Sequence, residues 1–206
     1  MKIIFIPLMY FMSQFFSSAY IWGQDSLESS DWKLKVQTDF YFSETFFVIP
    51  IISVVKDKLH LEARYLNEEV ETASVWLGYR ISGGNEFEYL FTPMIGGAFG
   101  RINGLAAELD FTLNLNDFEF ENELEYVFDV EAAENIFYYS IDLSYSSIDW
   151  LWFGISGRRA RLYQKGLDLQ RGLFIGVAYK NLEFTTYLFD IGFDSTFLML
   201  SLAGGF

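Results

Sequence analysis

Residues 118–128 read FEFENELEYVF, and this stretch decides the fold. Its apolar residues occupy even positions, apart from Val127, whereas Glu119, Glu121, Glu123 and Glu125 occupy odd positions. Successive side chains of a β-strand point to opposite faces, so one face of this segment would be apolar and the other acidic. An α-helix would scatter the four glutamates around its circumference. The stretch therefore predicts a two-faced strand.

The same period of two recurs along most of the chain after residue 31, and helical spacing is rare. We predict twelve strands, with ten or fourteen left open because alternation is weak in 43–56 and 154–172. Pro50 and Pro93 fall inside two of them, where a ladder hydrogen bond is lost, so bulges or strand ends are expected there. The predicted strands are 32–42, 46–55, 59–65, 73–80, 86–98, 105–115, 118–128, 137–145, 150–162, 171–180, 182–188 and 196–206.

The N-terminal segment has the layout of a secretory signal peptide. Lys2 is its only charge, an apolar run follows, and small residues precede Gly23. We expect cleavage after Gly23, which makes 1–23 the signal peptide and 24–206 a single barrel domain. The alternative is an uncleaved N-terminal membrane anchor.

Composition excludes several classes of protein. Hydrophobic residues make up 51% of the chain, which is too many for a disordered protein. Cysteine is absent, which excludes a disulfide-stapled or Cys-ligated zinc protein. Asp and Glu outnumber Lys and Arg by 28 to 14, so a nucleic-acid partner is not expected. No later segment has 18 consecutive uncharged apolar residues, which argues against a helical membrane protein.

The connections favour a transmembrane barrel. Twelve membrane-length strands with short connections need about 175 residues, close to the length of the predicted domain. Tight turns alternate with longer connections, as in outer-membrane barrels. The tight turns are 56–58, 83–85, 116–117, 147–149 and 180–181, and the longer connections are 67–71, 97–103, 129–135, 159–170 and 190–195.

Alternation alone leaves open which face is outside, because a soluble secreted barrel carrying an apolar ligand also alternates. Aromatic residues at strand ends favour the membrane arrangement, since they form interfacial girdles. Those residues are Phe40, Phe87, Phe118, Phe128, Phe137, Tyr145 and Tyr179.

The last predicted strand is amphipathic and ends at Phe206. A terminal aromatic residue in this position resembles the C-terminal signature of bacterial outer-membrane β-barrel proteins. The stretches 59–66, 90–100 and 157–179 also look like small, porin-like members of that class without an assigned function. The resemblance implies an antiparallel transmembrane β-barrel in a Gram-negative outer membrane. Its surroundings would be the lipid bilayer and outer-leaflet lipopolysaccharide, and Phe206 would serve recognition by the assembly machinery.

The polar face would then line the interior. Pairing through the turn at 116–117 places Asp110 opposite Glu123 and Glu108 opposite Glu125, and Asp142 is expected beside Glu123. Like charges directly opposite one another are unfavourable, so water, cations or arginines should lie against them. The predicted acidic wall consists of Glu108, Asp110, Glu119, Glu121, Glu123, Glu125 and Asp142.

A basic wall is expected across the lumen. Opposed acidic and basic walls resemble the constriction of general porins, and an acid-rich lumen favours cations. The sequence thus predicts a narrow channel for small polar or cationic solutes. The alternative is a structural salt-bridge network that plugs the lumen, helped by inward Trp76, Trp152, Phe174 and Tyr187. The basic wall consists of Lys33, Lys35, Arg64, Arg80 and Arg158.

A second basic group lies in the longest predicted loop, on the extracellular side. Its side chains would contact phosphates of the outer-leaflet lipid or pair with Asp168 and neighbouring loop acids. This group consists of Arg159, Arg161, Lys165 and Arg171, next to Arg158.

An enzymatic function is not expected, although an outer-membrane lipid-modifying enzyme is kept as an alternative. The single histidine, His60, lacks the His-x-Ser arrangement of the twelve-stranded outer-membrane phospholipase family, because position 62 is Glu. Serine-based hydrolysis needs an activating histidine next to the nucleophile. Glu108, Asp110, Glu123 and Asp142 could hold Ca²⁺, but no loop motif supports such a site. We therefore predict no cofactor and no metal.

Overall fold

The structure is a computed structural model that describes residues 31–66, 71–130, 135–161 and 169–206. Within these ranges, no helix is long and apolar enough to cross a membrane. The strands are β1 (Lys33–Phe42), β2 (Phe46–Lys56), β3 (Leu59–Leu66), β4 (Thr72–Tyr79), β5 (Ile81–Gly83), β6 (Phe87–Gly100), β7 (Gly104–Leu115), β8 (Phe118–Asp129), β9 (Ile136–Ile148), β10 (Leu151–Arg161), β11 (Leu169–Tyr179), β12 (Leu182–Phe189) and β13 (Phe197–Gly205).

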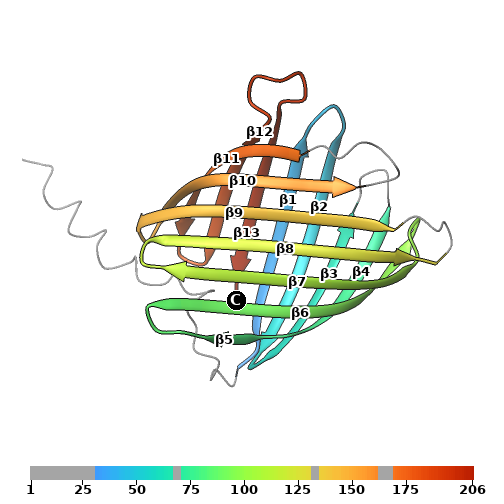
Figure 1. Cartoon of the computed structure of the whole chain (residues 1–206), viewed down its shortest axis with the longest axis horizontal. Helices are drawn as coiled ribbons and strands as arrows, with labels where there is room; N and C mark the ends of the chain where they lie inside the picture. The colour runs from blue at the N-terminus through green and yellow to red at the C-terminus, as the bar shows by residue number, and fades with distance from the viewer. Residues whose placement is uncertain (1–30, 67–70, 131–134, 162–168) are drawn as a thin grey trace, which may run out of the picture.

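The strands form one closed antiparallel barrel (Figure 1). Closure comes from pairing of β1 with β13, in which Val36 lies opposite Gly204. β4 and β5 both pair with β6, so they are one barrel strand interrupted at Arg80, and the barrel has twelve strands. The predicted all-β fold and strand number are therefore confirmed. Phe206 completes the closure through two backbone hydrogen bonds with Leu34, of 2.8 and 2.9 Å.

Both internal prolines mark the end of a ladder with one neighbouring strand. Pairing of β2 with β3 stops at Ile51, immediately after Pro50. The interruption between β4 and β5 lies opposite Pro93, between the Gly78–Met94 and Ile81–Phe91 pairs. Proline has no N–H to donate, which explains why each ladder ends there while the opposite ladder continues.

The two ends of the barrel differ in their connections. Two-residue turns join four pairs of strands at one end, here called the tight-turn end, and Asp57, Asn116 and Lys180 adopt positive φ in three of these turns. The opposite end, here called the long-loop end, includes the seven-residue connection between β12 and β13. The connection predicted at 97–103 is shorter than expected, because β6 continues to Gly100.

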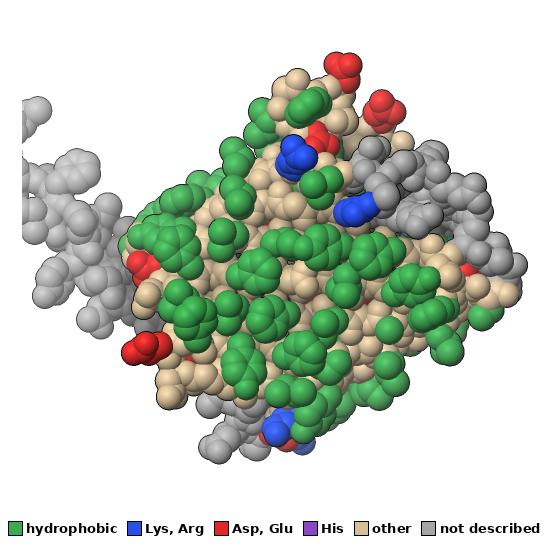
Figure 2. All heavy atoms as spheres, viewed as in Figure 1, with side chains coloured by type: hydrophobic (Ala, Val, Ile, Leu, Met, Phe, Trp, Pro, Cys, Tyr) green, Lys and Arg blue, Asp and Glu red, His purple; other side chains and the backbone are tan. Residues whose placement is uncertain are grey.

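The outer wall is apolar. Leu77, Leu173 and Ile175 are about half exposed, although each lies in the middle of a strand. Hydrophobic side chains cover the face shown in Figure 2, and acidic and basic groups gather at its margins. Aromatic residues such as Phe118 and Phe128 lie at opposite ends of this surface. The outer wall therefore matches a lipid-facing band, and it contradicts a soluble carrier with its apolar face inside.

Candidate functional site

The barrel encloses a cavity of about 770 Å³, lined by residues from all twelve barrel strands. Its lining extends from Asn116 and Asp149 at the tight-turn end to Ser43 and Gln170 at the long-loop end. Ten carboxyl side chains and four lysine or arginine side chains contribute to it. The lumen is thus a lengthwise space with an excess of acidic groups.

The register of β7, β8 and β9 brings the predicted acidic residues together. Asp110 lies opposite Glu123 and Glu108 lies opposite Glu125, as the turn at 116–117 predicts. Asp142 lies opposite Glu121 rather than beside Glu123 as expected, which shifts the β8–β9 pairing by two residues. Six of these acids line the cavity, and Glu108 is buried behind them with its side chain fully covered. The six are Asp110, Glu119, Glu121, Glu123, Glu125 and Asp142.

Arg64 connects the two walls that the sequence places apart. Its side chain starts on β3 and reaches β7 and β8, where Nη1 donates to Glu123 (2.8 Å) and Glu125 (3.3 Å). Nη2 donates to Glu108 at 2.5 Å, and Nε donates to Glu62 on its own strand. One guanidinium therefore serves four carboxylates in the middle of the barrel. A buried ionic group of this kind is unfavourable unless its donors and acceptors are satisfied.

The other predicted basic residues do not join Arg64 in one wall. Lys35 lines the cavity from β1 and Arg80 from the interruption between β4 and β5, whereas Lys33 is not part of the lining. Arg158 lies on β10, far around the barrel from β3. The basic side chains are thus distributed around the lumen and do not form the single wall that was predicted. Closure of the barrel places the strands that carry them at different positions around it.

Arg158 lies among aromatic rings. Its Nη1 donates to the Tyr41 hydroxyl at 3.1 Å, and its guanidinium lies 4.8 Å from the centre of the Tyr187 ring and 5.2 Å from that of Phe189. Its Nε has no hydrogen-bond partner among the described residues. Nearby, the Tyr187 hydroxyl donates to Asp142 at 3.1 Å. Cation–π contacts therefore replace ion pairs around this arginine.

Three of the four aromatic residues predicted to point inward, Trp76, Trp152 and Phe174, lie against the wall rather than across the bore. A Cβ atom placed on Gly176 would be 2.1 Å from the Trp152 indole, so the ring occupies the space of the missing side chain. Each ring sits on the glycine directly opposite it on the next strand, a pairing that keeps large side chains out of the lumen. The pairs are Trp76 with Gly96, Trp152 with Gly176, and Phe174 with Gly154.

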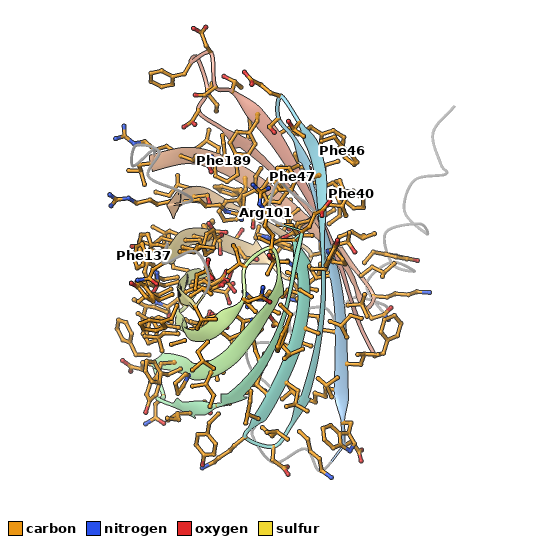
Figure 3. All side chains as sticks on the ribbon, turned by 90° about the vertical axis from the view of Figure 1, so that its right-hand side faces the viewer. Phe40, Phe46, Phe47, Arg101, Phe137 and Phe189 are labelled. Atoms are coloured by element: carbon orange, nitrogen blue, oxygen red, sulfur yellow. The ribbon has the colours of Figure 1, made fainter. Side chains whose placement is uncertain are left out.

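A further apolar cluster, which was not predicted from the sequence, narrows the lumen at the long-loop end. Phe189, Phe197 and Met199 are buried, and Tyr41 and Tyr187 pack against them. Along their strands, these residues occupy the same alternate positions as the polar residues that line the lumen. This alternation was the signal that could have located them. Figure 3 shows Phe47 and Phe189 on the inner side of the barrel and Phe46 on the outer side of β2.

Side chains of β10 alternate between the inside and the outside of the barrel. This alternation separates Arg158 from the predicted extracellular basic group. Arg158 points inward, whereas Arg159 and Arg171 lie on strands at the long-loop end, with Arg171 paired opposite Gly157. Neither Arg159 nor Arg171 forms an ion pair with a carboxylate of the described residues. The Arg161 side chain, Lys165 and Asp168 lie outside the described residues.

The groups considered for catalysis or metal binding are already engaged. His60 Nε2 lies 3.2 Å from Glu62, and no serine of the described residues hydrogen-bonds to this histidine. Carboxylate oxygens of Glu108, Glu123 and Glu125 lie within 4.8 Å of one another, a spacing that a metal ion could use. The Arg64 guanidinium contacts all three, so a cation already occupies the middle of this group.

Comparison with known proteins places the fold. No protein-family model matches the chain, and no curated protein matches it. Solved structures do match: the KdgM porin has a TM-score of 0.61 at 11% identity over 84% of this chain and 99% of the porin. A KdgM porin in complex with disordered oligogalacturonate gives 0.62 at 12% identity, with the same coverage of both chains. The NanC porin gives 0.55 at 10% identity, over 82% of this chain and 97% of its own. This chain therefore has the fold of the small bacterial outer-membrane porins.

Proposed function

We propose that the protein is a narrow channel in a Gram-negative outer membrane, selective for small cations and polar solutes over anions. The observation that carries the proposal is the cavity, whose lining reaches both ends of the barrel and contains ten carboxyl groups against four basic ones. A net acidic lumen lowers the energy of a passing cation and raises that of an anion. The apolar outer wall and the porin fold support the location.

A plugged structural barrel is the second candidate. The Arg64 cluster favours it, because this side chain reaches from β3 to β8 and occupies part of the lumen. Against a complete plug, the cavity has lining residues on both sides of Arg64, and the rings of Trp76, Trp152 and Phe174 lie against wall glycines.

Planar-bilayer recording separates the two candidates. Folded protein should give a KCl current whose reversal potential under a salt gradient indicates cation preference. Glu119→Gln combined with Glu183→Gln removes two lumen carboxylates without touching Arg64, and should lower the cation-to-anion permeability ratio about twofold. The matched control is Glu44→Gln with Asp57→Asn in exposed turns, which should leave the ratio unchanged. Absence of current from correctly folded protein would favour the plugged barrel.

Three further assignments accompany this proposal. The tight-turn end faces the periplasm and the long-loop end faces the outside, as in barrels of this type. Arg159 and Arg171 then lie at the level of the outer leaflet, where they contact lipopolysaccharide phosphates, and Phe206 serves recognition by the assembly machinery. No catalytic role is assigned, since no serine of the described residues hydrogen-bonds to His60, the protein's single histidine.

A further inference from the structure

The inner face of β2 differs from the rest of the lumen. Four of its five inward residues are apolar, and Ser53 is the exception. Ile49 and Ile51 line the cavity, remain partly exposed and belong to neither of the apolar clusters of the barrel. These two side chains therefore present an apolar surface to the passage.

A carboxylate lies directly beside this surface. Asp39 on β1 is paired with Ile49, and Gln37 is paired with Ile51. Asp39 is 7% exposed and lines the cavity. Its carboxylate accepts hydrogen bonds from Gln37 Nε2 (3.1 and 3.4 Å), and no lysine or arginine of the described residues forms an ion pair with it. Asp39 is thus a buried carboxylate that has no lysine or arginine counter-ion among the described residues.

The opposite wall carries the acids of β8, and Figure 1 shows β8 in front of the barrel and β2 behind it. Glu123 and Glu125 keep 30% and 20% of their side-chain surface exposed. Arg64, which is paired with Ile51, extends from the β3 side toward these glutamates. The space left beside Arg64 is therefore bordered by the isoleucines and Asp39 on one side and by carboxylates on the other.

We propose that Asp39, Ile49 and Ile51 form a binding site for a small organic ammonium ion with a short alkyl chain. The ammonium group would lie at Asp39 and the alkyl chain would pack on the two isoleucines. This inference rests on the proposed channel function and specifies its solute. An inorganic cation would gain nothing from the isoleucines, an anion would be repelled, and a neutral apolar molecule would not use the carboxylate. Apolar surface with a few placed polar groups is typical of small-molecule sites.

The test uses n-butylammonium and 3-hydroxypropylammonium, which carry the same charge and the same number of heavy atoms. Each is added to the KCl current of single channels in a planar bilayer. Because only the butyl chain gains from contact with the isoleucines, it should reduce the current at about fivefold lower concentration. Equal potency of the two ions would overturn the proposal.

Variants locate the effect. Ile49→Thr with Ile51→Thr keeps β-branched side chains on the strand but removes the apolar surface, so the preference for butylammonium should disappear while the KCl current persists. Ile52→Thr on the same strand is the control, since Ile52 points outward and is 49% exposed. Persistence of the preference in the Ile49→Thr/Ile51→Thr variant would also overturn the assignment.

A second measurement does not depend on conduction. Saturation-transfer NMR on the folded barrel in detergent compares binding of the same two ions to the unaltered protein and to Asp39→Asn. Binding of butylammonium should be stronger than that of 3-hydroxypropylammonium and should weaken in Asp39→Asn. Absence of a KCl current with this binding intact would refute the channel alone, whereas absence of the binding difference would refute the site.

Discussion

Arg64 and Arg158 are both inward-facing arginines, yet their surroundings are opposite. Arg64 donates to four carboxylates on three strands, whereas Arg158 contacts the hydroxyl of Tyr41, the sulfur of Met199 and two aromatic rings. The first arginine compensates charge that the barrel cannot otherwise bury. The second adds charge to an apolar cluster that could be packed without it. The comparison indicates that an inward arginine contributes strongly to stability where it serves carboxylates and weakly where it lies among aromatic rings.

The largest effect is expected from Arg64→Met. This change removes the counter-ion of Glu62, Glu108, Glu123 and Glu125, and breaking a buried ionic group costs about 3–5 kcal/mol. Urea unfolding of the detergent-folded barrel, followed by heat-modifiable migration, measures the loss. The control is Arg159→Met, which changes the same residue type away from the lumen acids. A loss no larger than that of the control would show that Arg64 is not the required counter-ion.

A smaller effect is expected from Arg158→Met. The change removes two cation–π contacts and the hydrogen bonds to the Tyr41 hydroxyl and the Met199 sulfur, but it also removes a buried charge that has no carboxylate in contact. The net loss should be about 1 kcal/mol, measured in the same unfolding assay. Removing this positive charge from the cavity lining should also increase cation preference in the bilayer. A loss as large as that of Arg64→Met would remove the distinction between the two sites.

The surroundings of the two arginines also show which contacts of the site could be predicted from the sequence. The partners Asp110–Glu123 and Glu108–Glu125 were predictable, because a two-residue turn fixes the register of a hairpin. The contact of Arg64 with Glu123 was not, since it depends on closure and on how far the barrel strands are staggered. Only the general requirement for a counter-ion near these acids could be stated from the residues.

The apolar surroundings of Arg158 and the inner face of β2 escaped prediction for a related reason. The segment 43–56 shows weak alternation because β2 is apolar on both faces, with Ile49 and Ile51 inward and Ile52 outward. A period of two cannot mark a strand whose faces are alike. Glycines opposite large inward residues, such as Gly176 opposite Trp152, become visible only when the register is known.

The smallest effect is expected from Tyr41→Phe, which tests whether Arg158 depends on its one hydroxyl partner or on the rings. The substitution removes the 3.1 Å hydrogen bond to Arg158 but keeps the ring that stacks on Phe47, with centroids 4.3 Å apart. Because the Arg158 guanidinium keeps its contacts with the Met199 sulfur and with two aromatic rings, the loss should be about 1 kcal/mol or less. The unfolding assay applied to Tyr41→Phe, Arg158→Met and the double variant gives the coupling energy. A coupling close to the full Arg158→Met loss would mean that the hydroxyl holds the guanidinium. A coupling near zero would assign that role to Tyr187 and Phe189, as the ring distances lead us to expect.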